Sequence, residues 1–436
     1  MTMRRTSTLA RPASLPEFRA GPAMWLIAAA VALVFADSTL PTPLYVIYAR
    51  TLGLSQIVLA LVFAAYVVGT VAALFLLGRI SDQIGRRPTL LPALALACAS
   101  ALVFAFAGNL AGLFAARILT GLAVGLCAGA ATAWIAELHP SRSQLHPSVV
   151  VVSANLAGLG LGPLLAGLLA QYASRPLVLP YLIYLALTLV VTAAVWRVTD
   201  TVRHRARRPA EVSLRPRIGV PPELRTAFTA PAANAFGIFA LIGFYAAILP
   251  SMLVRTLHQS SHATAGAVVG EVFIVATVAA VLTRRVDSHK AMLSGLVVLI
   301  PSLALLVLAE RTHLMPLLLA DAALAGISEG LGYRGGLEVI NQIAPDNQRA
   351  EVVSAYLICC YAGLSIPPVG VGILSELASP SLADLTFAAV VAVIAAAGLA
   401  IGLRYSPRRL GQGPAARRSR QGTTGDHPAD RHRDPQ

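Results

Sequence analysis

Apolar runs of about 20 residues recur along the chain, and they constrain its fold more than any other feature. A helix of that length crosses a hydrocarbon core of roughly 30 Å, and in lipid its backbone amides must bond within the segment. A water-facing exterior is excluded, because 56% of the residues are hydrophobic and only 12% are charged. The runs also lack the alternation typical of a membrane β-barrel. The sequence therefore predicts an all-α integral membrane protein.

Twelve runs are expected as transmembrane helices, in two groups of six. They cover residues 23–46, 57–77, 89–107, 111–136, 148–171, 178–197, 232–254, 263–283, 292–309, 314–335, 351–377 and 382–403. The first run is read as a retained helix rather than a signal peptide, because it is too long and contains Asp37. The predicted organisation is a cytoplasmic N-terminal arm (1–22), a six-helix bundle (23–198), a cytoplasmic linker (199–230), a second six-helix bundle (231–405) and a disordered cytoplasmic tail (406–436).

Basic residues are distributed unevenly among the predicted loops. With the N-terminus in the cytoplasm, nearly all of them fall in cytoplasmic loops and tails, and the opposite loops hold only Arg50, Arg175, Arg255 and Arg311. This bias predicts a protein of the inner cell membrane with both termini in the cytoplasm. It also explains the net charge of +14, so the lipid bilayer is the expected partner and nucleic acid is not.

The two halves of the chain repeat each other at a constant offset of 205 residues. Six pairs match at this offset: Asp82 and Asp287, Gly121 and Gly326, Gly125 and Gly330, Pro140 and Pro345, Gly158 and Gly363, and Pro163 and Pro368. Two parallel six-helix repeats joined by a linker are an arrangement that transporters use for alternating access, with the binding site between the halves.

The loop after the second run has a distinctive pattern of glycine, acid and arginine. Its defining residues are Gly78, Arg79, Asp82, Gly85, Arg86 and Arg87. Gly85 permits a tight turn, and Asp82 lies among arginines that can bond to it. The pattern resembles the loop signature of the major facilitator superfamily, G-x-x-x-D-x-x-G-R-R. The resemblance implies a gating network against the start of the eleventh helix, here near Glu351. The alternative is a merely basic cytoplasmic loop.

Two further motifs resemble the 12-helix drug:proton antiporter group of the same superfamily. Arg117 begins an R-x-x-x-G pattern about two turns inside the fourth run, where a charge is expensive, and the resemblance implies a role in proton coupling. Its alternative is an arginine that extends to the outer interface. The fifth run carries the antiporter motif, with Gly158, Gly162, Pro163 and Gly167. The resemblance implies export; generic packing of small residues is the alternative.

Acids within the runs are the candidates for proton coupling. Asp37 lies near the middle of the first run, where an ionised carboxylate is costly unless it is paired or hydrated. Its protonation should therefore respond to conformation and substrate, or it has a structural role in bonding to nearby hydroxyls. Glu271 and Glu329 are second candidates. Arg334 and Glu338, four residues apart on one helix, predict a local ion pair.

Polar and aromatic residues of the runs are candidates for a substrate cavity. They are Tyr45, Tyr66, Asn155, Asn234, Tyr245, Tyr356 and Tyr361, together with the aromatic pair Phe236 and Phe239. No metal or cofactor is expected, since the four cysteines lack metal-ligand spacing with histidine.

The leading hypothesis is a secondary active transporter that exports small amphipathic molecules or drugs in exchange for protons. A facilitator or proton symporter that imports a sugar or organic acid is the alternative. An enzyme is not expected, because no catalytic cluster or phosphate-binding glycine loop is present in the sequence. A monomer is expected, since a two-repeat fold encloses its site without a partner.

Overall fold

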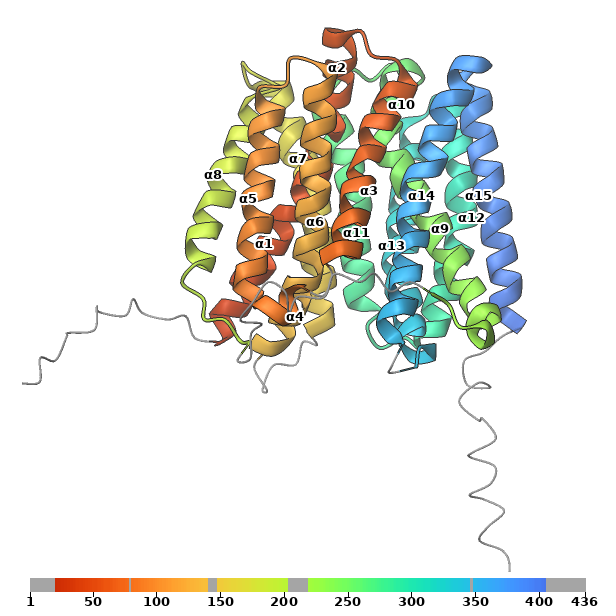
Figure 1. Cartoon of the computed structure of the whole chain (residues 1–436). Coiled ribbons are helices and arrows are strands. Elements are labelled where there is room, and N and C mark those ends of the chain that lie inside the picture. The colour runs from red at the N-terminus through yellow and green to blue at the C-terminus, as the bar shows by residue number, and fades with distance from the viewer. Residues whose placement is uncertain (1–19, 78–79, 140–146, 203–218, 346–347, 405–436) are drawn as a thin grey trace, which may run out of the picture.

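The computed structural model describes residues 20–77, 80–139, 147–202, 219–345 and 348–404, and every regular element in these ranges is a helix. Figure 1 shows the helices packed side by side in one bundle. Among the described residues, eleven helices are long and apolar enough to cross a membrane. A further apolar helix, α8 (Leu179–Val195), is shorter, at 17 residues. The chain is therefore a multi-pass membrane protein, as predicted.

Each predicted apolar run coincides with a helix or a pair of helices. The helices of the first half, including α4 in the loop between two runs, are α1 (Ala20–Thr39), η1 (Thr42–Leu44), α2 (Tyr45–Leu52), α3 (Gln56–Leu77), α4 (Ile80–Ile84), α5 (Arg86–Ala105), α6 (Leu110–Leu138), α7 (Pro147–Tyr172) and α8. In the second half they are η3 (Pro222–Leu224), α9 (Arg225–Ala247), α10 (Leu249–Arg255), α11 (His262–Leu282), α12 (Ser288–Thr312), α13 (Met315–Ile343), α14 (Arg349–Leu377) and α15 (Pro380–Arg404).

The helix α13 runs eight residues beyond the predicted end of the tenth run, at residue 335. It therefore includes both Arg334 and Glu338, and these side chains form the predicted local ion pair at 3.1 Å. The first seven residues of α9 likewise precede the predicted start of the seventh run, at residue 232. Polar or amphipathic turns extend both helices beyond their apolar part. A count of apolar residues does not detect such turns, so the predicted ends fall short of the real ones.

Proline interrupts the first helix of each half at a matching place. Helix α1 ends at Thr39, ahead of Pro41 and Pro43, because the residue before a proline disfavours the α conformation. In the second half α9 gives way to α10 next to Pro250. The short helices α2 and α10 contact each other and lie together at the top of Figure 1. We call this the α2–α10 end and the opposite end, where α4 lies, the α4 end.

The matched glycines of the two halves pack in equivalent ways. In two of the three matched glycine pairs a Cβ atom would lie only 2.1 to 2.4 Å from a carbonyl oxygen of a neighbouring helix. The glycines and the facing residues are Gly121 with Tyr66, Gly326 with Val272, Gly158 with Ala32, and Gly363 with Phe236. The contacts α3–α6 and α1–α7 in the first half thus correspond to α11–α13 and α9–α14 in the second. The sequence repeat is therefore also a repeat of close backbone packing.

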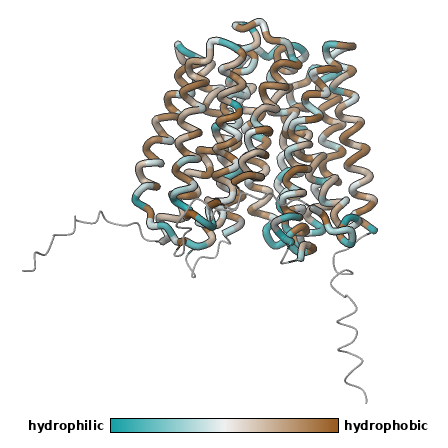
Figure 2. Tube along the Cα trace, in the orientation of Figure 1, coloured by the Kyte–Doolittle hydropathy of each residue, from teal (hydrophilic) through white to brown (hydrophobic). Residues whose placement is uncertain are grey.

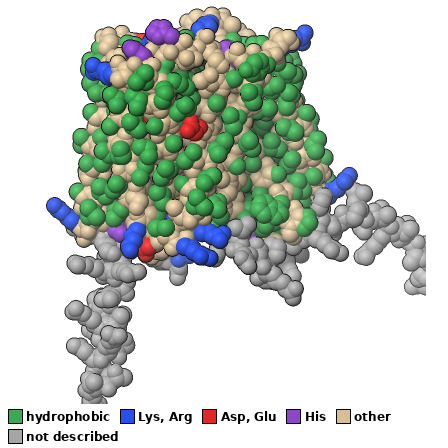
Figure 3. Space-filling view, turned by 180° about the vertical axis from the view of Figure 1, so that it is seen from behind, with side chains coloured by type: hydrophobic (Ala, Val, Ile, Leu, Met, Phe, Trp, Pro, Cys, Tyr) green, Lys and Arg blue, Asp and Glu red, His purple; other side chains and the backbone are tan. Residues whose placement is uncertain are grey.

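The lateral surface is apolar and the two ends are polar. Figure 2 shows hydrophobic residues along the length of the helices and hydrophilic ones at their ends, and Figure 3 shows Lys, Arg and His gathered at the two ends. Large aliphatic side chains are exposed between them, for example Val68, Val190 and Val393 at 66%, 69% and 69%. Such a belt of exposed hydrophobic side chains suits a hydrocarbon surrounding.

Candidate functional site

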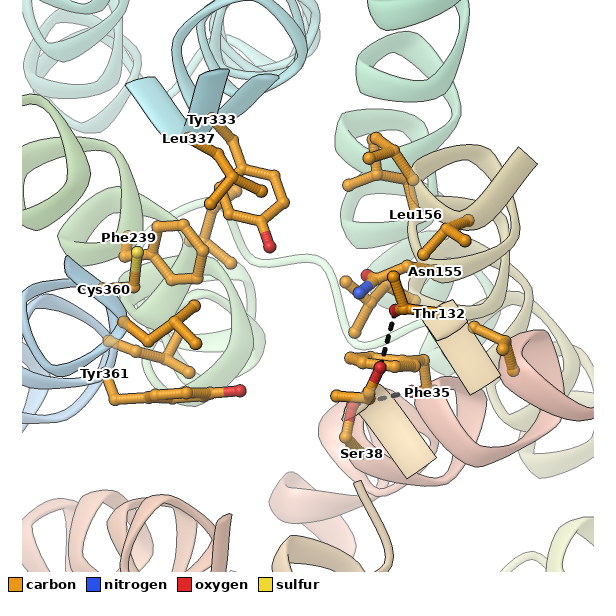
Figure 4. Close-up of a pocket in the computed structure, with 18 of the residues that line it drawn as sticks. Phe35, Ser38, Thr132, Asn155, Leu156, Phe239, Tyr333, Leu337, Cys360 and Tyr361 are labelled. Atoms are coloured by element: carbon orange, nitrogen blue, oxygen red, sulfur yellow. Dashed lines mark hydrogen bonds between the residues drawn. The ribbon is translucent and has the colours of Figure 1, made fainter. Parts of the chain in front are cut away.

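A cavity of about 510 Å³ lies between the two halves. Eight helices line it: α1, α3, α6 and α7 from the first half, and α9, α11, α13 and α14 from the second. Its lining begins in the middle of the bundle, at Phe35 and Tyr66, and continues to Leu74 and Ala136 near the α4 end. Figure 4 shows the two walls facing each other, with Phe35 on one and Phe239 on the other. The volume suits a drug-sized molecule.

Two equivalent hydrogen bonds between the halves hold the α2–α10 end together. The backbone N–H of His262, at the start of α11, donates to Gln171 Oε1 at the end of α7, at 2.9 Å. The backbone N–H of Ile57, at the start of α3, donates to Glu376 Oε1 at the end of α14, at 3.3 Å. Donors and acceptors are both related by the 205-residue offset. We call them the latch bonds, and each satisfies an otherwise unpaired amide of a helix start.

Among the described residues that line the cavity, Glu329 of α13 is the only charged one. Its side chain is 3% exposed, and its Oε2 atom has no hydrogen-bond partner among the described residues. The neighbouring lining residues, Phe239 and Tyr333, are aromatic. A buried carboxylate without a partner is unfavourable when ionised, so it attracts a proton or an organic cation into this part of the wall.

Of the nine predicted cavity residues, Tyr66, Asn155, Phe239 and Tyr361 line the cavity, and Phe236 does not. The other four, which are Tyr45, Asn234, Tyr245 and Tyr356, are fully buried between helices and are not part of its lining. Asn234 Nδ2, for example, donates to the carbonyl oxygen of Gly332 at 2.9 Å, and joins α9 to α13. Aromatic and amide groups serve helix packing as readily as ligand binding, and their type alone does not separate the two.

Asp37 lies inside the first half, away from the cavity. It is fully buried, and its Oδ2 accepts a hydrogen bond from Thr120 Oγ1 at 2.8 Å. Thr120 in turn lies 2.7 Å from the Ser100 hydroxyl, so α1, α5 and α6 meet at this carboxylate. Its Oδ1 has no hydrogen-bond partner in the described part of the chain. The predicted bonding to hydroxyls is thus present. Asp37 is not part of the cavity lining, whereas the next two residues, Ser38 and Thr39, are.

Arg117 is fully buried and does not extend to the interface. Its Nε donates to the Tyr45 hydroxyl at 2.7 Å, and its Nη1 donates to the Ser38 carbonyl oxygen at 2.6 Å. The guanidinium also lies 5.3 Å and 5.5 Å from the ring centres of Tyr45 and Phe63. A positive charge at the last carbonyls of α1 stabilises that helix end. Among the described residues no ion pair joins Arg117 to Asp37, although both hold the same end of α1.

Glu271 lies at mid-length of α11 and points away from the cavity. It shares a helix face with Ile274 and Val278, which are 44% and 51% exposed. The cavity-lining Phe273 is two residues further, about 200° around the helix. The three predicted acids therefore occupy three different surroundings: Glu329 the cavity, Asp37 the interior of one half, and Glu271 the outer surface.

The loop motif forms a network within the first half. Gly78 and Arg79 lie outside the described residues, and Gly85 has a φ of 117°, which explains the need for glycine there. The Arg86 guanidinium pairs with Asp82 and, at 2.8 Å, with Glu137 at the end of α6. Figure 1 shows α4 below α5 and α6, on the side of the bundle away from the start of α14. The network present here thus joins the loop to α6 rather than to Glu351.

The same network holds the start of the linker between the halves. Asp200 accepts hydrogen bonds from the backbone N–H groups of Arg86 and Arg87 at 3.3 and 3.0 Å. Arg87 Nη1 donates to the carbonyl oxygen of Trp196 at 3.1 Å, and Thr201 bonds to Glu137. The segment after α8 is therefore fixed to the start of α5.

The glycines of the fifth-run motif allow α7 to approach two helices at once. On one side, a Cβ at Gly158 or Gly162 would lie 2.1 or 2.3 Å from a carbonyl oxygen of α1. On the other side, a Cβ at Gly167 would lie 2.5 Å from the carbonyl oxygen of His262 in α11. The carbonyl oxygen of Pro163 faces Gly266 of α11 in the same way. At this motif the backbone of α7, in the first half, therefore touches the backbone of α11, in the second half, with no side chain between them.

Other cavity residues had no signal of their own in the sequence. They include Ser38, Thr132, Phe273, Tyr333 and Cys360. Tyr333 is four residues after Glu329 and so shares its helix face, and Ser38 follows Asp37; both relations could have drawn attention to them.

Comparisons with known proteins agree with this geometry. The chain is 27% identical over 129 residues to an uncharacterized MFS-type transporter of Methanocaldococcus jannaschii, covering 30% of this chain and 33% of that protein. It is 26% identical over 143 residues to the quinolone resistance protein NorA of Staphylococcus aureus strain Mu50, covering 33% of this chain and 37% of NorA. The chain thus spans about a third of the length of these relatives.

A family model described as Major Facilitator Superfamily matches residues 27–363, which is most of the chain. The match includes the loop motif, Arg117 and the α7 glycines, the features on which the resemblance was based. The chain belongs to the Major Facilitator Superfamily.

Proposed function

We propose that this protein exports small amphipathic cations in exchange for protons, by alternating access of a central cavity. Members of the superfamily are transporters and not enzymes. The observation that carries the proposal is the cavity itself: its wall is mostly apolar, and Glu329 is the one charged residue among the described residues that line it. An apolar wall with one acid selects a molecule that has an apolar body and a single positive charge.

In the proposed topology α8 also crosses the membrane, which gives twelve transmembrane helices in two six-helix bundles, 23–198 and 231–405. The matching glycine contacts of the two halves support this arrangement. Both termini and the 199–230 linker are placed in the cytoplasm of a monomer in the inner membrane, since the basic loops lie at the α4 end. The cavity then faces the cytoplasm, and the latch bonds close the external side.

The proposed coupling is competition at Glu329. When the Glu329 carboxylate is ionised it attracts the cation, and when it takes up a proton from the external side that attraction is lost and the substrate leaves. One carboxylate cannot bind the proton and the cation at once, so export of substrate requires import of a proton.

Asp37 is proposed as a second titratable group. Its neighbour Ser38 lies in the cavity wall and accepts the Arg117 bond, so a proton on Asp37 would act on this wall through the end of α1.

The loop motif is proposed as the gate of the cytoplasmic side. In the conformation described here Arg86 bonds to Glu137, and the cavity reaches the α4 end. Closing that end requires the start of α14, with Glu351, to move against the loop.

The similarity to NorA, whose name refers to quinolone resistance, supports export of drug-like molecules over import of a nutrient.

The test is transport driven by a pH gradient in proteoliposomes, with tetraphenylphosphonium as the cation and tetraphenylsilane as its neutral isostere. The cation should accumulate against its gradient, and the Glu329→Gln variant should lose this accumulation. A matched control is Glu338→Gln, an exposed acid on the same helix. Accumulation by Glu329→Gln, or downhill movement alone in the unaltered protein, would contradict proton-coupled export; the latter would favour a facilitator.

A further inference from the structure

Glu271 is an acid in the middle of the bilayer-facing surface. Ten residues into α11, it lies about 13 Å from the start of that helix, at 1.5 Å of rise per residue. It shares its face with the exposed side chains Ile274, Val278 and Leu282, which are 44%, 51% and 77% exposed. Figure 3 shows acidic atoms halfway between the two ends of the molecule, surrounded by hydrophobic side chains.

The Glu271 carboxylate has no hydrogen bond or ion pair within the part of the chain that the structure describes. The neighbouring helices α7 and α13 approach α11 through glycines, such as Gly160 and Gly326, and supply no basic group there. An ionised carboxylate at this depth is costly unless it is paired or hydrated. Glu271 can avoid this cost by taking up a proton, whereas an ionised Glu271 needs a counter-charge from the bilayer, because the described residues supply none.

The position of Glu271 defines the chemistry of that compensating group. A phospholipid ammonium group resides at the interface, about 13 Å away along the helix axis, whereas Glu271 faces acyl chains. A cation that reaches this depth needs an apolar body around its charge. Lipophilic organic cations, such as phosphonium and quaternary or tertiary ammonium compounds with aromatic substituents, satisfy this requirement.

The surroundings of Glu271 connect this surface to the cavity. Its neighbour Gly270 lies in the contact between α7 and α11, where a Cβ at Gly160 would be 3.2 Å from the Gly270 carbonyl oxygen. Phe273 of the same helix lines the cavity on the far side. Glu271 therefore faces the bilayer on one side of the closely packed pair α7 and α11, and the cavity that contains Glu329 lies on the other side.

We propose that Glu271 and the apolar face of α11 around it bind lipophilic organic cations from the bilayer, as a membrane-side site that precedes the cavity. The proposal rests on the proposed export of amphipathic cations, and it adds the place from which they are taken. Glu271 then contributes to substrate capture rather than to proton exchange in the cavity.

The test uses the unaltered protein in proteoliposomes and dicyclohexylcarbodiimide, an apolar reagent that modifies protonated carboxyl groups reached from the bilayer. Mass spectrometry measures the modification of Glu271. Tetraphenylphosphonium, at ten times the concentration that gives half protection, should reduce this modification about tenfold. Tetraphenylsilane should not reduce it, and modification of the exposed Glu338 should be unaffected by either compound. Equal protection by both compounds, no protection, or no modification of Glu271 would overturn the proposal.

Transport in the same vesicles separates this proposal from the proposed function. In the Glu271→Gln variant the concentration for half-maximal transport of tetraphenylphosphonium should rise about tenfold, with the maximal rate unchanged. An unchanged concentration would refute capture at Glu271 while Glu329-dependent export stands. Conversely, pH-driven accumulation that survives Glu329→Gln would refute the proposed function, and protection of Glu271 would still stand.

Discussion

Removing the two latch bonds should shift the protein away from the conformation described here. In the double variant Gln171→Ala, Glu376→Ala the amides of His262 and Ile57 lose their side-chain acceptors, so the α2–α10 end loses both latch bonds. The bond from Gln56 Nε2 to the Ala247 carbonyl oxygen, at 3.4 Å, still joins the halves there. The cavity-forming contacts at the α4 end are untouched. The fraction of molecules open at the α2–α10 end should therefore rise.

The magnitude follows from the type of bond. A net hydrogen bond contributes about 0.5 to 1.5 kcal/mol, and a carboxylate at a helix N-terminus about 0.3 to 1 kcal/mol. Both side chains are exposed, so the lower part of each range applies. The sum of about 1 to 2 kcal/mol changes the ratio of the two conformations by a factor of roughly 5 to 30. In the variant Gln171→Glu both latch bonds have a carboxylate acceptor, so the α2–α10 end should stay closed.

Distances between spin labels measure this shift. Labels at Arg175→Cys in the first half and Thr312→Cys in the second, in a background without the four native cysteines, report on the α2–α10 end. The longer distance should gain population in the double variant. The control is Thr51→Ala at the same end, since the Thr51 hydroxyl bonds only to carbonyl oxygens of its own helix. Unchanged distance distributions in the double variant would refute the idea that these bonds hold the end closed.

Three further predictions concern individual contacts. Gly158→Ala should lower the free energy of unfolding, measured by thermal denaturation, by about 1 to 3 kcal/mol, because its Cβ would lie 2.1 Å from the Ala32 carbonyl oxygen. The control Gly370→Ala should have no such effect, since a Cβ there meets nothing within 4 Å. Equal melting temperatures of the two variants would contradict the close α1–α7 contact. Tyr45→Phe should lower the free energy of unfolding by about 1 to 3 kcal/mol, because the buried Arg117 Nε loses its acceptor while Arg117 Nη1 keeps the Ser38 carbonyl oxygen. The control Tyr172→Phe, at an 80% exposed residue, should be neutral. A double-mutant cycle on Arg86 and Glu137 should give a coupling energy of about 1 to 2 kcal/mol, and a value near zero would remove the bond from the network.

The helices and their repeat could be predicted from the sequence because the bilayer imposes a strong and simple rule. A span must be apolar and must satisfy its own backbone, so each run reads directly as a helix. The 205-residue offset was equally informative, since Gly158 and Gly363 face carbonyl oxygens of equivalent helices. Only the ends of the helices differ, as at α13, where polar turns continue the helix beyond the apolar core.

The surroundings of the acids could not be predicted in the same way. Asp37, Glu271 and Glu329 each lie well inside a predicted apolar run. The hydropathy of such a run is the same whether a residue is on its lipid-facing side or on its packed side. The surroundings of each acid depend on which side of its helix contacts the neighbouring helices. In α11 that side is marked by Gly266 and Gly270, which contact α7, and Glu271 lies on a different side. Small residues mark the packed faces of these helices better than hydrophobicity does.

The partner of the loop motif was predicted from the resemblance as the start of α14, whereas Arg86 bonds to Glu137 in this conformation. A gate has different partners in its open and closed states, and one sequence encodes both. The structure describes the state in which the cavity reaches the α4 end.

The most direct test of proton-coupled export is the release of protons from the purified protein when substrate binds. In weakly buffered detergent solution near neutral pH, tetraphenylphosphonium should release protons from the unaltered protein, and tetraphenylsilane should release none. Glu329→Gln should abolish the release, while Glu338→Gln should retain it. Release that persists in Glu329→Gln, or cation binding by the unaltered protein without any release, would contradict the claim that substrate and proton compete at Glu329.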